Sequence, residues 1–540
     1  GKFLENATNP YDGAWKPHYP NMMFKIDKKI NETVVRLVNA KDPDTAKPDM
    51  KDQATVRNIQ RMHNNFAACM DEAQRTKAGR EPLRRHLELV VKIYSVPGSP
   101  IEPKKAPGVT IKKNIITGQF LRNHWTTFIN PSVEFNKATG DNKKNELSAI
   151  TGQFLRDGLT ALIGLPIYQD LKVPTLNRMY LGPGGVGLPI ESYKDSGFTG
   201  VYEMLIGELF HILYEPVDPV AGKHGDLQLE APQKWKDVAK AVVEFEKAFA
   251  EVIAPAQKDP DPETGFKLVT VTNLANFSRS LDWNVIFKNA FIGDIKAPTE
   301  IMVPVTLPQY LKKLDELLTA TDPKTIQLFF AWSMIFAFAE FLDEPHRSFL
   351  DHFKWPQPPA RADLCSTNTL NNVPDIVSHY YVEAALPERI RTKAGETVNA
   401  VLSAFSKSFQ LVQPHDWRYN ATRNGALAKI TNITQIIGYS KAGPDDSSSS
   451  SIDQFYSGLT LDGQDHFGNQ VRAKTFWAQV EFGKLNKNVD KMHMGAEASK
   501  NNAYYNPQIN SINVPAGSLQ SPRFNVEFPE YLNYGAFANL

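Results

Sequence analysis

Residues 501–519 read N-N-A-Y-Y-N-P-Q-I-N-S-I-N-V-P-A-G-S-L. Three aliphatic residues, Ile509, Ile512 and Val514, sit among small polar residues between two prolines. This pattern predicts a short strand between turns, and proline favours the edge of a sheet because it lacks the N–H that a strand ladder needs. The free N–H and C=O groups of an edge strand can pair with an extended peptide. The stretch therefore predicts a surface that binds a peptide main chain.

The composition is that of an ordinary globular protein. The chain has 540 residues, of which 42% are hydrophobic and 22% charged, and its formal net charge is +1. At this length more than one structural domain is expected. No basic run is interleaved with aromatic residues, as a nucleic-acid groove would require, so we predict no nucleic-acid partner. The chain begins at Gly1 without an apolar signal-peptide core, and we interpret it as a processed or trimmed product.

Hydrophobic periodicity predicts helices over most of the chain. Residues 24–94 and 234–253 carry apolar side chains at a period of about 3.6 residues. Residues 326–342 are almost wholly apolar, which leaves two interpretations open. A membrane span needs about 20 apolar residues, and Gln327 and Glu340 interrupt this run. We favour the other interpretation, a helix at the centre of a large helical domain.

Two short motifs have alternative interpretations. The glycine-rich stretch 181–189 could be taken for a phosphate loop, but it lacks the Lys-Ser/Thr that follows such a loop, so we interpret it as a structural turn. Glu208, His211 and Glu215 share one face of a predicted helix and could bind a metal ion. Their order matches no zinc-protease motif, and an amphipathic helix surface is the simpler interpretation.

The C-terminal stretch resembles the signature block of the neprilysin-like zinc metallopeptidases. The residues that carry the resemblance are Asn502-Ala503-Tyr504-Tyr505, Asn510-x-Ile512-x-x-Pro515-Ala516-Gly517, Leu519-Gln520-x-Pro522-x-Phe524 and Leu532-Asn533-Tyr534-Gly535. The segment from Trp417 to Lys429 and the Ile437-Gly438-Tyr439 string are also similar to the family pattern. The resemblance covers nearly all of the chain.

The resemblance implies a mainly α fold, with a large multi-helix domain and part of a mixed α/β metallopeptidase catalytic domain that enclose a central cavity. Residues 1–24 are expected to pack on the catalytic domain. Residues 25–468 would form the large helical domain, and residues 469–540 would begin the catalytic domain with the substrate-aligning edge strand.

Substrate-binding residues follow from the same resemblance. In the family the N-A-x-Y strand hydrogen-bonds the substrate main chain, which implies this role for Asn502, Ala503 and Tyr505. Ser518 replaces an aliphatic residue of the family pocket beyond the cut bond, and Arg523 replaces an aromatic one. We therefore expect Ser518 and Arg523 to make this pocket more polar, so that it disfavours large apolar side chains.

The family's zinc chemistry needs residues that this chain lacks. Two histidines of an H-E-x-x-H helix bind zinc, and the glutamate between them serves as general base. None of the 12 histidines belongs to such a motif, and by the family's spacing the chain stops about two residues before it. The resemblance thus implies zinc only in the complete enzyme, with no metal ligand, no catalytic residue and no activity in this chain alone.

Two functions remain open at this point. In the first, the chain supplies the helical cavity wall and the substrate-binding strand of a zinc metalloendopeptidase that hydrolyses small peptides. Its partners would be the C-terminal zinc-bearing fragment of the same peptidase and the peptide substrates. In the second, the chain is a catalytically inactive peptidase-like protein that acts as a binding or structural module.

Cysteines and glycosylation sequons bear on localisation. The chain has two cysteines, Cys69 and Cys365, and composition alone leaves free thiols and a disulfide equally open. The resemblance implies that they form a disulfide. Asp12 stands where the family has another cysteine, so the family's tie between the termini is in doubt. Candidate glycosylation sites are five Asn-x-Ser/Thr sequons, at Asn6, Asn31, Asn276, Asn420 and Asn432. We expect an extracellular protein, either secreted or the ectodomain of a membrane-anchored one.

Overall fold

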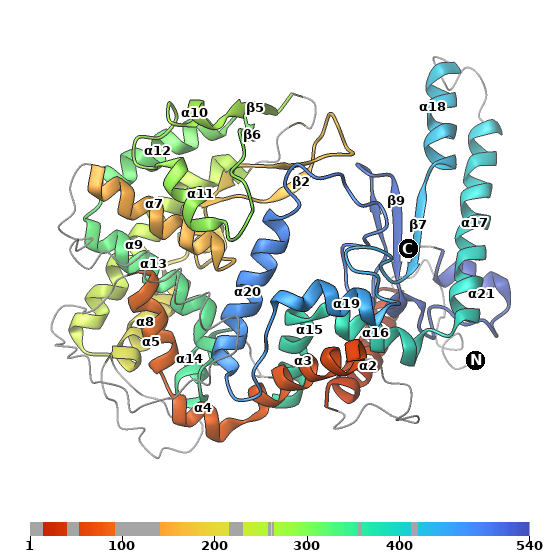
Figure 1. The fold of residues 1–540 in the computed structure, drawn as a ribbon, viewed down its shortest axis with the longest axis horizontal. Coiled ribbons are helices and arrows are strands. Elements are labelled where there is room, and N and C mark those ends of the chain that lie inside the picture. The colour runs from red at the N-terminus through yellow and green to blue at the C-terminus, as the bar shows by residue number, and fades with distance from the viewer. Residues whose placement is uncertain are drawn as a thin grey trace. The chain divides into compact units, whose positions relative to one another are not determined.

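The computed structural model describes residues 15–39, 53–91, 141–214, 231–257, 261, 264–354, 359–411 and 420–538. Most of these residues are in helices, so the prediction of a mainly α chain is confirmed (Figure 1). Contacts divide the chain into two compact units. Unit 1 comprises Gly1–Met70, Pro359–Gly458 and Val489–Leu540, and unit 2 comprises Asp71–Pro358 and Leu459–Asn488. Both units are discontinuous in sequence. The domain boundaries predicted at residues 24 and 468 stay predictions, and so does the central cavity.

In its described residues, unit 2 consists of helices and three two-stranded antiparallel sheets. The strand pairs are β1 (Ile163–Gly164) with β4 (Gly182–Pro183), β2 (Ile167–Gln169) with β3 (Asn177–Met179), and β5 (Phe266–Thr270) with β6 (Glu300–Pro304). Its α-helices are α4 (Glu72–Ala78), α5 (Glu81–Val90), α7 (Asp141–Arg156), α8 (Ser196–Tyr214), α9 (Gln233–Ile253), α10 (Val271–Leu274), α11 (Trp283–Ala290), α12 (Leu307–Ala320), α13 (Pro323–Phe338), α14 (Glu344–Lys354) and α20 (His466–Phe482). The 3₁₀ turns are η3 (Ile190–Lys194), η4 (Ala254–Gln257) and η5 (Ala339–Phe341).

Helix α13 lies in the core of unit 2. Phe329, Phe330 and Trp332 are fully buried in it, because a helix that is apolar on every side gains most when other helices surround it. Among the described residues, no helix is long and apolar enough to cross a membrane. The prediction of a central core helix is therefore confirmed.

A carboxyl group is buried in this core. Glu246 of α9 is fully buried, and its carboxyl accepts hydrogen bonds from the Tyr193 hydroxyl at 2.9 Å and the Gly187 N–H at 3.2 Å. The Tyr202 hydroxyl also hydrogen-bonds to it and accepts in turn from the indole N–H of Trp332 at 2.6 Å. Burial raises the pKa of Glu246 from 4.5 to about 7 because the charged form loses its hydration.

Unit 1 combines helices with one three-stranded sheet. Its α-helices are α2 (Trp15–Asn39), α3 (Gln53–Met70), α15 (Arg361–Asn372), α16 (Pro374–Ala385), α17 (Glu388–Leu411), α18 (Asn420–Thr431), α19 (Ser449–Phe455) and α21 (Glu530–Ala536), and its 3₁₀ turns are η6 (Tyr456–Gly458) and η7 (Ala516–Leu519). Helices α17 and α18 pack side by side (Figure 1). The sheet order is β7-β9-β8, with β7 (Thr434–Gly438) parallel to β9 (Ser511–Pro515) and β8 (Tyr504–Asn506) antiparallel to it.

The sheet corrects one expectation from the sequence. The stretch around Ile512 and Val514 was expected at a sheet edge, whereas β9 is the central strand and β7 and β8 are the outer strands. Proline does not prevent this position because Pro507 lies in the β8–β9 turn and Pro515 is the last residue of β9. Every strand residue before Pro515 therefore keeps its N–H for the ladder. Ile509 lies in the turn and not in a strand.

The disulfide implied by the resemblance is present in unit 1. Cys69, near the end of α3, and Cys365 of α15 are both fully buried, with their Cα atoms 5.5 Å apart. Hydrogen bonds next to the bridge also join these helices. The Asn65 amide donates to the Thr369 hydroxyl, and the Asn372 amide donates to the Asn65 side-chain oxygen, each at 3.0 Å. The two helices are therefore held together both covalently and by a buried polar network.

Candidate peptide-binding site

Strand β8 offers a free edge for a peptide main chain. One side of β8 pairs with β9, with Tyr505 opposite Ile512 and Asn506 opposite Ser511. No strand within the described ranges pairs with the other side of β8. Unpaired N–H and C=O groups along such an edge can form ladder hydrogen bonds with an extended peptide. The structure thus places an edge strand at Tyr504–Asn506, overlapping the segment where the sequence resembles the family strand.

A largely apolar cavity lies beside this edge within unit 1. Its volume is about 210 Å³, below the roughly 300 Å³ at which whole small-molecule sites begin. Its size suits one side chain rather than a complete ligand. The lining residues come from α17, β8, β9 and the segment after α21: Thr397, Val398, Val401, Leu402, Ala503, Tyr504, Tyr505, Ile512, Val514, Phe537 and Ala538.

The path of the chain into β8 depends on Gly517. A Cβ atom on Gly517 would lie 2.1 Å from the Ser499 carbonyl oxygen and 2.7 Å from that of Lys500. The Gly517 N–H donates to the Ala498 carbonyl at 2.8 Å. The Pro-Ala-Gly motif therefore brings the η7 turn against residues 498–500, which lead directly into the edge strand.

The predicted substrate-binding residues occupy different environments. Asn502 is exposed, and its side-chain oxygen accepts from the Ala503 N–H at 2.9 Å. Ala503 and Tyr505 both line the cavity, and the Tyr505 side chain is 46% exposed. The structure thus brings Ala503 and Tyr505 together at the cavity, with Asn502 adjacent in the chain.

Ser518 and Arg523 lie in the interior of unit 1. Both are fully buried, and neither is among the residues that line the cavity. The Ser518 hydroxyl donates to the Pro515 carbonyl at 2.7 Å. The Arg523 guanidinium donates to the Asn501 side-chain oxygen at 2.6 Å, and the Asn501 amide donates to Asp27 of α2. Both polar side chains therefore contact the strand ends and the segment that leads into β8.

The serine-rich loop differs from its sequence pattern. Residues 443–451 look like an exposed low-complexity loop, yet Pro444 and Asp446 are buried and Ser448 caps α19 by accepting from the Ser451 N–H. Hydroxyl side chains favour this position because they replace a missing helical acceptor. Burial, reinforced by the negative charge of Asp375, raises the pKa of Asp446 to about 8.

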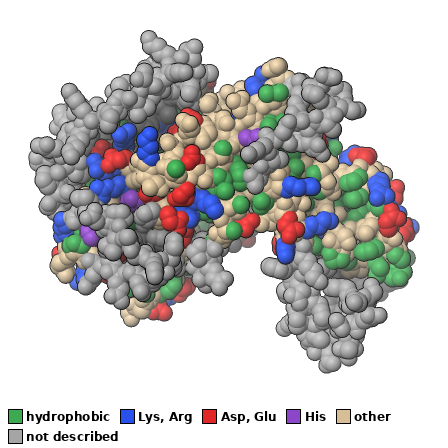
Figure 2. All heavy atoms as spheres, turned by 90° about the horizontal axis from the view of Figure 1, so that it is seen from below, with side chains coloured by type: hydrophobic (Ala, Val, Ile, Leu, Met, Phe, Trp, Pro, Cys, Tyr) green, Lys and Arg blue, Asp and Glu red, His purple; other side chains and the backbone are tan. Residues whose placement is uncertain are grey.

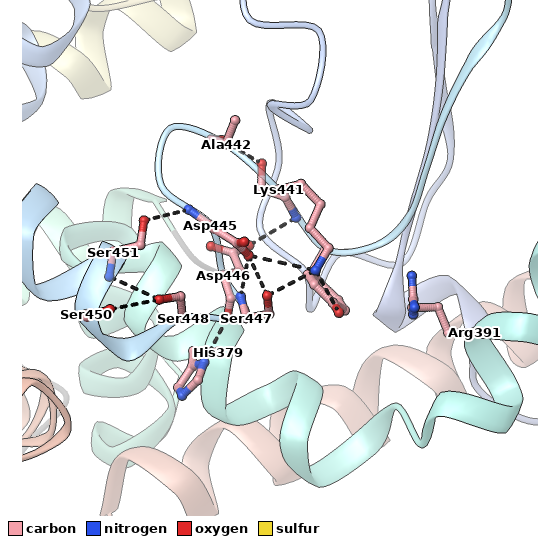
Figure 3. Close-up of polar contacts among 12 residues, drawn as sticks. His379, Arg391, Lys441, Ala442, Asp445, Asp446, Ser447, Ser448, Ser450 and Ser451 are labelled. Atoms are coloured by element: carbon pink, nitrogen blue, oxygen red, sulfur yellow. Dashed lines mark hydrogen bonds and ion pairs between the residues drawn. The ribbon is translucent and has the colours of Figure 1, made fainter. Parts of the chain in front are cut away.

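Figure 3 shows the polar contacts of this loop, in which the Lys441 ammonium reaches both Asp445 and Ser447. The Lys441 ammonium donates to the Ser447 hydroxyl at 3.0 Å and lies 4.4 Å from the centre of the Tyr439 ring. His379 approaches from α16, with its ring Nδ1 2.7 Å from the Asp446 carbonyl oxygen. These contacts order the loop, which explains why a serine run here has a defined structure.

The remaining candidate residues are dispersed. The sequon asparagines Asn31, Asn276, Asn420 and Asn432 are exposed, while Asn6 lies outside the described residues. The His211 ring Nδ1 is 3.9 Å from Glu208, whose other carboxylate oxygen accepts from a backbone N–H, and Glu215 is outside the described part. No group of three or more His, Cys, Asp or Glu side chains in the described ranges could hold a metal ion.

Sequence reasoning missed the contribution of α17 and of the β8–β9 turn. Thr397 and Val398 face the cavity from a helix that lies about a hundred residues earlier in the chain. Val398, Val401 and Leu402 lie at helical spacing, which was a usable signal for an apolar helix face but does not indicate which surface that face meets. In the sequence Lys429 is part of a family-like motif, which does not indicate that its ammonium donates to the Pro507 carbonyl in this turn.

Comparison with known proteins agrees with this architecture. The N-terminal model of peptidase family M13 matches residues 16–440, and a second model described as peptidase family M13 matches residues 502–540. The chain is 25% identical over 415 residues to neprilysin-11 of Caenorhabditis elegans, covering 73% of this chain and 47% of that protein. It is 24% identical over 403 residues to endothelin-converting enzyme 1 of Rattus norvegicus, covering 73% and 50%. The chain spans about half the length of these curated relatives.

Solved structures show the same fold. The zinc metalloprotease Zmp1 of Mycobacterium tuberculosis, in complex with an inhibitor, superposes with a TM-score of 0.70 at 22% identity, covering 96% of this chain and 66% of that one. PepO of Lactobacillus rhamnosis superposes with a TM-score of 0.67 at 15% identity, covering 96% and 70%. The fold and the matched family models are thus those of a metallopeptidase family. The chain belongs to peptidase family M13, the family of neprilysin and the endothelin-converting enzymes.

Proposed function

We propose that this chain forms the substrate-aligning part of a zinc metalloendopeptidase that hydrolyses small peptides. The free edge of β8 beside an apolar cavity carries the proposal, because a protease must hold its substrate extended and place one side chain in a pocket. Directly opposed residues of an antiparallel pair share a face of the sheet, so Tyr505 and Ile512 would both contact that side chain.

The zinc site is not supplied by the described residues. A zinc ion in this family activates water for attack on the peptide bond, but the described part of the chain holds no cluster suited to a metal, and the sequence has no H-E-x-x-H motif. We assign no step of hydrolysis to these residues. Their role is to bind the substrate main chain and orient it, and the zinc-bearing fragment of the same peptidase is the proposed partner.

Substrate preference is part of the proposal. Ser518 and Arg523 stand where the family pattern has an aliphatic and an aromatic residue, so a substrate pocket that they help to form in the complete enzyme would be more polar. We expect weaker cleavage of peptides with a large apolar side chain beyond the cut bond. Comparing Phe-containing with Asp-containing peptides in the zinc-loaded protein measures this, and a strong preference for Phe would contradict it.

An extracellular location fits the bridge and the exposed sequons. Disulfides persist in oxidising compartments, and the Cys69–Cys365 bridge is fully buried. Glycosidase treatment of the native protein, followed by intact mass, tests the proposal. A mass that does not change would count against glycosylation at every sequon.

The proposed function is tested by measuring peptide hydrolysis, zinc content and intact mass on one native preparation. We expect a second zinc-bearing polypeptide, about one zinc per complex, and hydrolysis that a chelator abolishes. A lone chain without zinc and without hydrolysis would overturn the proposal and would favour the alternative, an inactive binding or structural module. In that case β8 would still bind peptides, which a direct binding titration would detect.

A further inference from the structure

The turn between β8 and β9 contains a residue in a rare backbone conformation. Asn510 has a φ of 55°, in the left-handed region that Asn tolerates better than most residues. The turn is also held at its start, where the Asn506 side-chain oxygen accepts from the Gln508 N–H at 3.0 Å. Such Asx contacts are typical of tight turns. The turn is thus specified by two asparagines, one on each side of Pro507.

The Asn510 side chain makes two bonds outside its own backbone. Its oxygen accepts from the Tyr505 hydroxyl at 3.0 Å, and its amide donates to the Lys429 carbonyl at 2.8 Å. The last carbonyls of a helix have no partner within the helix, and Lys429 lies in the last turn of α18. Asn510 therefore satisfies a free helix carbonyl and holds the Tyr505 side chain at the same time.

Lys429 completes the connection in the opposite direction. Its ammonium donates to the Pro507 carbonyl at 3.4 Å, so the end of α18 contacts both ends of the turn. The backbone adds one more link, because the Thr434 N–H at the start of β7 donates to the Asn510 carbonyl at 2.9 Å. Lys429 and Asn510 are thus the two side chains that join this helix to the hairpin of the edge strand.

We propose that Lys429 and Asn510 form a latch that positions the substrate-aligning strand β8. This inference rests on the proposed function. β8 has three residues and, within the part of the chain that the structure describes, a strand partner on one side only, and a short edge strand of this kind frays easily. The latch fixes the turn and the Tyr505 ring, and so holds the free edge of β8 in the extended geometry that a substrate main chain needs. Lys429 and Asn510 are positioning residues and do not touch the substrate.

The test uses Asn510→Gly and Lys429→Met in the intact protein. Glycine tolerates the left-handed backbone, so Asn510→Gly removes the two side-chain bonds without straining the turn. The backbone amides of residues 503–506 should exchange about tenfold faster, since each lost hydrogen bond increases the opening equilibrium a few-fold. Lys429→Met should give a smaller increase, and Lys429→Arg should restore protection. Gln508→Ala, at an exposed position in the same turn, is the matched control and should change nothing.

Steady-state kinetics separate positioning from simple stabilisation. With the fold intact, Asn510→Gly should raise KM for peptides roughly three- to tenfold with little change in kcat. A double-mutant cycle of Asn510→Gly with Tyr505→Phe should be non-additive, because both changes remove the same bond.

Three results would count against these ideas. Unchanged hydrogen exchange in Asn510→Gly would show that no latch exists. Faster exchange with an unchanged KM would overturn the positioning role and leave a structural contact. A zinc-loaded wild-type complex with no peptidase activity would overturn the proposed function itself, whatever the variants show in hydrogen exchange.

Discussion

Replacing Glu246 by glutamine should change how the stability of unit 2 depends on pH. Glu246 is fully buried, and no basic side chain among the described residues forms an ion pair with it. Burial raises its pKa to about 7 in the folded protein from 4.5. The folded state therefore prefers the protonated carboxyl, whose stabilisation is fully present below about pH 4.5 and is lost as the pH rises through about 7.

The size of the effect follows from the two pKa values. Each pH unit between 4.5 and about 7 lowers the free energy of unfolding by about 1.4 kcal/mol, so the total loss is about 3 kcal/mol. Glutamine can still accept from the Gly187 N–H and hydrogen-bond to the Tyr193 hydroxyl, but it carries no charge at any pH. The stability of Glu246→Gln relative to wild type should therefore rise by about 3 kcal/mol between pH 4.5 and pH 8.

Denaturant unfolding followed by tryptophan fluorescence measures this difference. Trp332 hydrogen-bonds to Tyr202 beside the carboxyl, so its emission reports on the surrounding core. The control is Glu244→Gln on the same helix, where the side chain is 69% exposed and its charge is solvated. Equal pH dependence in wild type and Glu246→Gln would refute the reasoning, because the buried carboxyl would then not be the group that titrates.

Three further changes test other parts of the structure. Gly517→Ala places a Cβ atom 2.1 Å from the Ser499 oxygen, so it should destabilise unit 1 by about 1–3 kcal/mol, and an unchanged melting temperature would contradict this. Replacing Cys69 and Cys365 together by serine opens a bridge between positions 296 residues apart. The free energy of unfolding, measured with guanidinium, should fall by about 2–5 kcal/mol. A variant as stable as the disulfide-bonded wild type would contradict this. Burial raises the pKa of Asp446 to about 8 from 3.8, so the stability of the folded protein should fall as the pH rises between these values. Asp446→Asn should make the melting temperature depend less on pH across that range. Parallel curves of melting temperature against pH for wild type and variant would argue against this.

The extent of successful prediction differs between the core and the site. The helical core was predictable because the apolar side chains of α9 repeat at the helical period and α13 is an almost continuous apolar run, and both patterns depend only on neighbouring residues. The location of the edge strand was predictable from the resemblance of residues 502–505 to a known family. The central position of β9 was not, because the ladder between β7 and β9 joins residues about 80 positions apart.

The site shows the same contrast at the level of single residues. Asn510 and Lys429 stand 81 residues apart in sequence, and neither has a local pattern that indicates the other. The serine run at 447–451 has the composition of an exposed loop, but the burial of Asp446 beside it depends on contacts with α16. Ser518 and Arg523 are buried in unit 1, where Pro515 and Asn501 accept their hydrogen bonds, and their part in a substrate pocket stays a prediction.

The sequence by itself determined the helices, the apolar core and the family, because these follow from local periodicity and from motifs that are contiguous in the chain. The tertiary structure alone decided the central position of β9, how Gly517 brings the chain into β8, and which residues hold the β8–β9 turn. Those features depend on close approach between distant segments, as in the 2.8 Å bond between Asn510 and Lys429. Such contacts form only when the packing of the whole unit brings their partners together.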